Sequence, residues 1–203
     1  RMFSKCGLTS LDLSGFDTSN VTNIDYMFSD CSKIVNIKLS KNFKTKNITN
    51  MESIFVRCSK LESLDLSSFD TSNVSDMSGM FSSCRSLKSL DLSSFNIFNV
   101  NDLGYMFYNC ESLKTLKLNN FNTENVNNME YMFEGCTNLV NLDLSSFDTS
   151  NVTKKTGMFY RTTCPVTVGP KWNLTEEETM YSGSFIHPEL SLINSVKKTH
   201  KKI

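Results

Sequence analysis

The sequence predicts an α/β solenoid of about six 26-residue coils, with short parallel strands on one face and helical or 3₁₀ segments on the other. Two observations predict it. A Met-Phe or Ile-Phe pair recurs at intervals of 25, 27, 26, 26, 26 and 26 residues, and a cysteine follows three residues after each Phe from Cys6 to Cys136. One such unit is too small to cover its own apolar side, so the coils must stack and share a core.

Each coil carries two apolar rhythms, which the third coil illustrates. Leu64-Asp65-Leu66 alternates apolar and polar residues, as a short strand with one buried face does. Residues 70–73 are polar turn formers. The apolar residues that follow are spaced three and four apart, as on one face of a helix or a run of 3₁₀ turns. They are Val74, Met77, Met80, Phe81 and Cys84.

Asparagine and cysteine each occupy one slot, meaning a position that is equivalent under the repeat. Because Asn73 precedes the helical rhythm and Asp76 stands at its third position, we expect a capping or stacked-amide role rather than ligand binding. The asparagine slot holds Asn20, Asn47, Asn73, Asn99, Asn125 and Asn151. The cysteines share one slot and form no Cys-x-x-Cys pair, which favours buried structural thiols over a disulfide framework or a zinc site.

The ends of the chain depart from the repeat. Residues 1–160 are predicted to form the solenoid, and residues 161–203 a carboxy-terminal cap with a polar, basic tail that includes the lysine-rich run 197–202. Because Arg1 lies inside a coil, we expect the solenoid to be truncated at its amino terminus. Trp172 is expected to cover the open end of the core, and Thr175-x-x-Glu178 has the form of a capping box.

The repeat resembles a known family. Leu61-x-x-Leu64-x-Leu66, followed by Phe69 and by Met80-Phe81-x-x-Cys84, resembles the leucine-rich repeats of bacterial BspA-like surface proteins. The unit FDTSNVTNMxxMFxxCxxLxxLDLSS looks like their 26-residue surface-protein repeat, and the resemblance covers about residues 2–160. It implies a leucine-rich-repeat solenoid, secreted or at the cell surface, in a family associated with adhesion to host proteins or other cells. It supplies no residue-level binding motif.

Composition argues against several classes of protein. Twenty-one basic residues balance 21 acidic ones, so the chain has no basic excess with which to bind nucleic acid. No apolar run approaches the roughly 18 residues of a membrane span. The only histidines are His187 and His200, and there is no phosphate-binding glycine loop or Ser-His-Asp arrangement. We therefore expect no enzymatic activity, no cofactor and no metal site.

The exposed residue between the two strand leucines is predicted to form a contact surface, which we call the strand-face ladder. Each lysine in it lies between two aspartates, so we expect cross-strand pairs worth about 0.2 to 1 kcal/mol and no calcium site. Small polar residues flank the ladder, which indicates binding through hydrogen bonds. The strand-face ladder consists of Asp12, Lys38, Asp65, Asp91, Lys117 and Asp143.

The fourth coil departs from the repeat in a way that predicts a second binding surface. The slots that elsewhere read Thr-Ser hold Ile97-Phe98, Tyr105 and Tyr108 follow, and Tyr131 lies one coil further on. Surface aromatic clusters are enriched at binding sites, so we predict a patch for a protein partner or for self-association. The alternative interpretation is that these side chains fill a local packing gap.

Together these features predict a non-catalytic protein-binding module. The ectodomain of a bacterial surface adhesin is the favoured interpretation, with host matrix proteins or other cell-surface proteins as partners and an extracellular or cell-surface location. The alternative is an intracellular leucine-rich-repeat scaffold or a secreted effector. An export signal or lipid anchor in a longer precursor would favour the adhesin.

Overall fold

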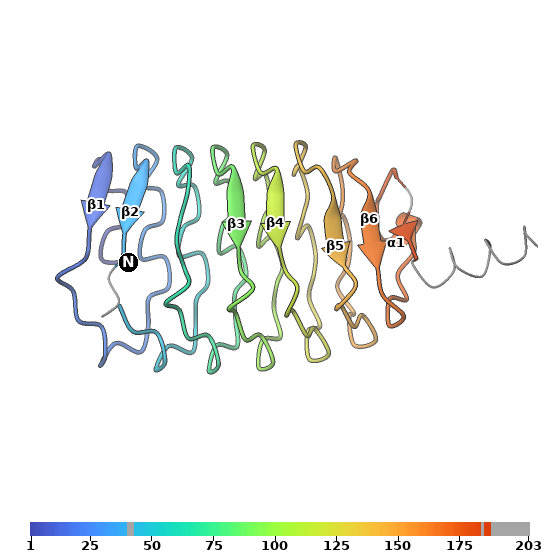
Figure 1. Ribbon diagram of the computed structural model, residues 1–203, viewed down its shortest axis with the longest axis horizontal. Coiled ribbons are helices and arrows are strands. Elements are labelled where there is room, and N and C mark those ends of the chain that lie inside the picture. The colour runs from blue at the N-terminus through green and yellow to red at the C-terminus, as the bar shows by residue number, and fades with distance from the viewer. Residues whose placement is uncertain (40–42, 184, 188–203) are drawn as a thin grey trace, which may run out of the picture.

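The computed structural model describes residues 1–39, 43–183 and 185–187. Its coils lie side by side along the long axis of the molecule, and the labelled strands follow one another on the same side of the stack (Figure 1). The helix α1, Glu176–Thr179, follows the last full coil. The strands are β1 Ser10–Asp12, β2 Asn36–Lys38, β3 Ser89–Asp91, β4 Thr115–Lys117, β5 Leu142–Leu144, β6 Val166–Val168 and β7 Phe185–Ile186.

The strands pair in parallel, with equivalent residues of neighbouring coils opposite one another. Leu11 faces Ile37 between β1 and β2, and Leu90 faces Leu116 between β3 and β4. The last sheet has the order β5-β6-β7. The predicted solenoid with parallel strands is therefore correct, although the strands form three short sheets instead of one continuous face.

The third coil lacks the strand predicted at Leu64-Asp65-Leu66. Sheet β1-β2 ends before this coil and sheet β3-β4 begins after it. The preceding coil is one residue longer at this point: Phe43 lies four residues after Leu39, whereas Phe69 lies three after Leu66. The extra residue lies directly after β2, but β4 and β5 are also not paired with each other although Leu116 and Leu142 keep the 26-residue spacing, so the extra residue alone does not explain the missing strand.

The second predicted element, the helical segment, is also wrong. Residues 77–84 form successive β-turns, in which the Met80 N–H donates to the Met77 carbonyl and the Cys84 N–H to that of Phe81, at 3.3 and 3.1 Å. The third residue of each turn, Gly79 and then Ser83, has a φ of +61°. A left-handed residue suits a type II turn and interrupts a right-handed helix. The apolar side chains are therefore spaced three and four residues apart because of the length of the turns, and this spacing does not indicate a helix.

Backbone hydrogen bonds between coils hold these turns in place. The Gly79 N–H donates to the Gly104 carbonyl at 2.8 Å, and the Phe81 N–H to the Met106 carbonyl at 2.9 Å. Parallel bridges continue the contact from coil to coil through Asn23, Asn50, Asp76, Asp102, Asn128 and Lys154. The solenoid therefore has a second ladder of inter-coil bonds besides the strands, and we call its exposed side the turn face.

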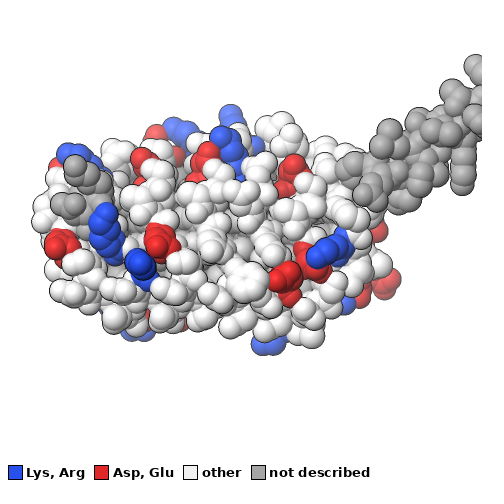
Figure 2. All heavy atoms as spheres, turned by 60° about the horizontal axis from the view of Figure 1, so that its bottom comes forward, with Lys and Arg blue, Asp and Glu red and all other residues white. Residues whose placement is uncertain are grey.

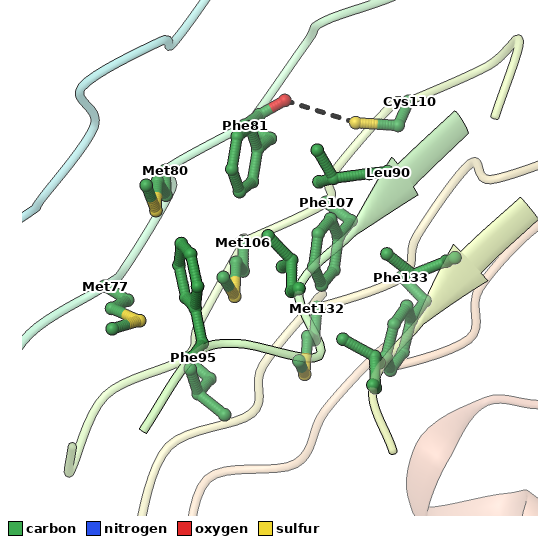
Figure 3. Packing of buried hydrophobic residues seen from close by; sticks show 14 of the residues in the cluster. Met77, Met80, Phe81, Leu90, Phe95, Met106, Phe107, Cys110, Met132 and Phe133 are labelled. Carbon is green, nitrogen blue, oxygen red and sulfur yellow. Dashed lines mark hydrogen bonds between the residues drawn. The ribbon is translucent and has the colours of Figure 1, made fainter. Parts of the chain in front are cut away.

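The core is a stack of like residues. The rings of Phe81 and Phe107 lie 5.8 Å apart and nearly parallel, and Phe133 continues the row (Figure 3). Burying each such ring contributes about 1.5–3 kcal/mol. The full row is Phe3, Phe28, Phe55, Phe81, Phe107, Phe133 and Phe159.

The cysteines from Cys31 to Cys164 are buried free thiols, whereas Cys6 is half-buried. Cys110 donates from Sγ to the carbonyl oxygen of Phe81 in the preceding coil at 3.2 Å (Figure 3). Burial raises the pKa of the Cys110 thiol to about 12. In the last coil Thr162 takes the cysteine slot, and its hydroxyl donates to the Phe133 carbonyl at 2.6 Å. The cysteine slot therefore requires a small side chain that can donate a hydrogen bond to the preceding coil.

The asparagine slot forms a stacked amide ladder and caps no helix. Asn73 donates from Nδ2 to the Lys46 carbonyl of the preceding coil at 2.7 Å, and Asn99 does the same to Ser72. The Asp76 carboxylate accepts from the Ser78 N–H at 2.8 Å, which is a local Asx-turn. Asp76, which was predicted to complete a helix cap, therefore stabilises a turn instead.

The carboxy-terminal end of the core is covered by aromatic side chains. Trp172 is buried, and its ring centroid lies 6.2 Å from that of Phe159. Phe185 packs against both rings. The predicted capping box at Thr175 and Glu178 is present at the start of α1. The predicted basic tail at 197–202 lies outside the described residues.

Candidate functional site

The strand-face ladder is exposed in full, as predicted: Asp12, Lys38, Asp65, Asp91, Lys117 and Asp143 all face solvent. Its pairing differs from the prediction. Lys38 pairs with Asp12 at 3.0 Å and Lys117 with Asp91 at 2.8 Å, so each lysine binds the aspartate of the preceding coil only. Among the described residues, the partners expected on the other side, Asp65 and Asp143, form no ion pair with these lysines, and neither β2 nor β4 is paired with a strand of the following coil.

A hollow of about 770 Å³ opens on the strand face where the third coil lacks its strand. Lys38, Asp65 and Asp91 lie on its walls, together with serines and the partly buried Leu64. The Ser67 N–H donates to Asp65 at 2.9 Å, and this bond holds the pKa of that carboxyl below its usual value. The hollow offers polar side chains of both charges to a partner.

The predicted aromatic patch is only partly assembled. Tyr105 stacks on Tyr131 with ring centroids 5.0 Å apart and meets Tyr108 edge-on at 5.7 Å. Tyr105 and Phe98 are 43% and 51% exposed. Within the part of the chain that the structure describes, no ring contact joins Phe98 to the tyrosines.

Ile97 is not part of any surface patch, because its side chain is only 1% exposed. It occupies a slot that holds threonine in every other coil. Thr71, its equivalent, donates from Oγ1 to the Asn96 carbonyl and accepts from the Asn96 N–H, both at 2.9 Å. Ile97 replaces this hydrogen-bonding side chain with an apolar one, so the packing interpretation is correct for this residue.

The tyrosines border a second hollow, of about 570 Å³, on the turn face. Its lining includes small residues such as Ser53 and Gly79 together with Tyr105, Tyr108 and Arg57. The sequence contains the signal for it in the slot before each core methionine or Ile54. This slot reads Tyr26, Ser53, Gly79, Tyr105, Tyr131 and Gly157, so a ring is missing in two successive coils.

A third hollow, of about 330 Å³, adjoins this one, because Arg57, Ser83 and Arg85 line both. Ser32, Ser59 and Asp30 complete its lining. Arg57 reaches Asp30 at 3.2 Å, and Arg85 reaches Glu111 at 3.3 Å. We call the joined hollows the turn-face groove.

Charges of both signs are mixed on the described surface, and some of them form ion pairs such as Lys38 with Asp12 and Arg57 with Asp30. On the face that Figure 2 shows, basic and acidic side chains are interspersed among uncharged ones. No cluster of three or more His, Cys, Asp or Glu side chains that could hold a metal ion occurs among the described residues. None of the helices in residues 1–39, 43–183 and 185–187 has the length and apolar character needed to cross a membrane.

Comparison with known proteins places the chain among repeat proteins. A family model described as "Mycoplasma protein of unknown function, DUF285" matches residues 1–115 and 87–187. This family is related to the BspA-like repeats, which confirms the resemblance drawn from the sequence. No curated protein matches the chain.

Among solved structures, a leucine-rich repeat protein from Bacteroides ovatus ATCC 8483 is similar to this chain. The two are 20% identical, with a TM-score of 0.45, over 92% of this chain and 56% of that one. The chain therefore spans about half the length of that protein.

Proposed function

The chain belongs to the DUF285 family, described as Mycoplasma proteins of unknown function, and we propose that it is a non-catalytic protein-binding module that acts as a surface adhesin. Its partners would be host matrix proteins or proteins on other cells. The observation that carries the proposal is the strand face: a row of exposed charged side chains, held in register by β1-β2 and β3-β4, beside a polar hollow. Solenoids present extended surfaces of this kind to partners.

The form of the strand face matches a protein partner better than a small metabolite. The ladder spans several coils, and neighbouring strands lie about 4.8 Å apart, so a partner that contacts the whole row must itself be extended. Exposed pairs such as Asp91 and Lys117 contribute little stability, which leaves their charges free to set partner choice and association rate.

A charge swap tests the strand face without removing the ion pair. The double variant Asp91→Lys and Lys117→Asp keeps opposite charges on the two slots but exchanges their positions. The chain and this variant would be measured by surface plasmon resonance against purified matrix and plasma proteins. The swap of Glu62 and Lys88, an exposed ion pair that is outside the ladder and lines none of the three hollows, is the matched control. We expect the first swap to weaken binding at least tenfold and the control to leave it unchanged.

Location is tested separately. Intact cells that produce the chain naturally would be treated with a protease and labelled with an antibody against the solenoid. Surface labelling that protease removes supports the adhesin. Labelling only after the cells are opened, or binding to none of the purified proteins, would argue for the intracellular scaffold instead.

A further inference from the structure

The turn-face groove has two chemically different ends. The larger hollow, which we call the ring end, is lined by the rings of Tyr105 and Tyr108, and the smaller one, the arginine end, by the guanidinium groups of Arg57 and Arg85, which also line the ring end where the two hollows join. Serines line both hollows: Ser53, Ser78, Ser82 and Ser83 at the ring end, and Ser32, Ser59 and Ser83 at the arginine end. Two carboxylates, Glu52 and Asp30, also line the groove, and Asp30 is paired with Arg57. A ligand that fits this groove must satisfy the rings, the hydroxyls and the cations together.

The ring of Tyr105 contacts two other tyrosine rings and remains partly exposed. Tyr131 of the next coil stacks against it with a centroid distance of 5.0 Å, and Tyr108 meets it edge-on. In the preceding coil the same slot is Gly79, which has no side chain, and in the coil before that it is Ser53. The ring is therefore braced by Tyr131, lines the groove and is 43% exposed, so its exposed part can serve as a platform for the apolar face of a ligand ring.

The arginines are available to a ligand. Their carboxylate partners, Asp30 and Glu111, lie at the surface, and the side chains of Arg57 and Arg85 are 67% and 58% exposed. Exposed ion pairs of this kind are weak, so a ligand anion can compete for the planar guanidinium donors. Arg57 and Arg85 line one hollow from neighbouring coils, so a single anionic group can bind both.

Apolar anchoring is nearly absent. Val56 is the only aliphatic side chain in the lining of the ring end, and the arginine end has none. The buried Leu- or Phe-sized pockets that anchor a peptide are therefore missing from the described part of this groove. A sugar satisfies what is present: one face of its ring is apolar, its edges carry hydroxyls, and an acidic sugar adds an anion.

We propose that the turn-face groove binds an acidic oligosaccharide, with a sugar ring on Tyr105, hydroxyls on the serines and the anionic group on Arg57 and Arg85. The anion is a carboxylate or a sulfate, both of which match the guanidinium fork. The groove shares no lining residue with the strand-face hollow. This site is therefore independent of the protein-binding surface, and either proposal can fail alone.

The repeat itself supplies variants that should fold. Ser53 already occupies the Tyr105 slot with a φ of +54°, Ser83 occupies the Arg57 slot with a φ of +61°, and Ser59 occupies the Arg85 slot. The test variants are Tyr105→Ser and the double variant Arg57→Ser with Arg85→Ser. The controls are Tyr160→Ser and Arg161→Ser, which remove an exposed ring and a cation outside the groove.

Binding to the full chain would be measured by isothermal titration calorimetry. The probes are a hyaluronan octasaccharide, which carries carboxylates only, a heparin octasaccharide, which also carries sulfates, neutral maltoheptaose, and a poly-glutamate peptide. We expect at least one acidic octasaccharide to bind, both groove variants to weaken that binding tenfold or more, and both controls to leave it unchanged. Maltoheptaose should not bind. The two acidic probes identify the anionic group.

Three outcomes would overturn the proposal. The first is that neither acidic octasaccharide binds. The second is that binding occurs but the groove variants do not alter it. The third is that poly-glutamate binds as tightly as the sugars and loses affinity in the same variants, which would make the groove a peptide site. Near-native circular dichroism of each variant is required before its affinity is interpreted.

Discussion

The Cys110 thiol donates a hydrogen bond to the carbonyl oxygen of Phe81 at 3.2 Å, and the same relation recurs between Cys136 and Phe107 at 3.1 Å. Each bond links one coil to the coil before it, at a position where the carbonyl has no access to water. Buried carbonyl groups that lose their donor cost free energy, so this slot is selected for a small donor.

An isosteric pair of variants isolates that bond. Cys110→Thr keeps a donor, as Thr162 does in the last coil, whereas Cys110→Val has the same shape without one. We expect the Val variant to lose about 1–2 kcal/mol more free energy of unfolding than the Thr variant. Urea denaturation followed by circular dichroism measures the difference. If Val is as stable as Thr, the hydrogen bond does not stabilise the stack.

A second pair of variants tests the threonine slot. Thr71→Val removes the two hydrogen bonds between Thr71 and the Asn96 backbone, and we expect it to cost about 1–3 kcal/mol. Ile97→Thr restores the repeat residue in the next coil, where a new bond to the Asn122 backbone would offset part of the lost apolar burial. Its change in unfolding free energy should stay within about 1 kcal/mol in either direction. A loss from Ile97→Thr as large as that from Thr71→Val would show that Ile97 has a packing role that threonine cannot replace.

Acid should weaken the stack over a defined range of pH. Hydrogen bonds from Ser14 lower the pKa of Asp12 from 3.8 to about 2, and hydrogen bonds from Ser150 lower that of Asp148 to about 2 as well. Because these values lie below those of the unfolded chain, the stabilisation is complete above about pH 4 and is lost as the pH falls through 2. Urea midpoints measured at pH 5, 3 and 2 should therefore fall in that order. Asp148→Asn should flatten the decline, and a midpoint that stays constant down to pH 2 would contradict the argument.

The thiols should titrate in the opposite direction. Burial raises the pKa of Cys110 from 9.0 to about 12 and that of Cys164 to about 11. The protonated thiols therefore stabilise the fold fully below pH 9, and the contribution is lost as the pH rises through 11 and 12.

At pH 8 a thiol reagent such as Ellman's reagent should react quickly with the half-buried Cys6 and slowly with the other six cysteines. Cys6→Ser should remove the fast phase, and several fast thiols in the native chain would show that the cysteine slot is open to solvent.

The 26-residue repeat period determines much of this fold, and the period is evident from the sequence. Phe81 and Phe107 are 26 residues apart and stack in register, as the period requires. The exposure of the strand-face ladder follows from the same logic, because one residue between two inward leucines must point outward. The stacking of the core rings and the exposure of the ladder are therefore confirmed, whereas the cross-strand pairs expected from the same equivalence form on only one side of each lysine.

Inferences that depend on backbone conformation inside a coil were less reliable. The spacing of Met77, Met80 and Cys84 fits a helix and a chain of turns equally well, and the left-handed Ser83 that decides between them has no distinctive side chain. The missing strand at Leu64 was not predictable from the motif, because this coil has the same Leu-Asp-Leu pattern as the coils that form β1 and β3.

The site was predicted in part for a related reason. Ile97 looked exposed because threonine normally occupies its slot, but that threonine is itself buried: Thr71 is 1% exposed. The turn-face groove was missed because it forms where two successive coils lack the tyrosine ring that other coils have in the same slot. Gly79 and Ser53 are informative only when they are compared with Tyr105 in the same slot.

The left-handed positions of the turns have an evolutionary consequence. Their backbone is fixed by bonds from main chain to main chain, so the side chain at each one is left to vary: Tyr105, Gly79, Arg57, Asn109 and Asp30 all occupy such positions. Substitutions at these positions can therefore change the surface one residue at a time without changing the fold. Duplication of a whole coil would add another variable position. The solenoid is thus a repeated backbone whose left-handed turn positions can carry different surface side chains.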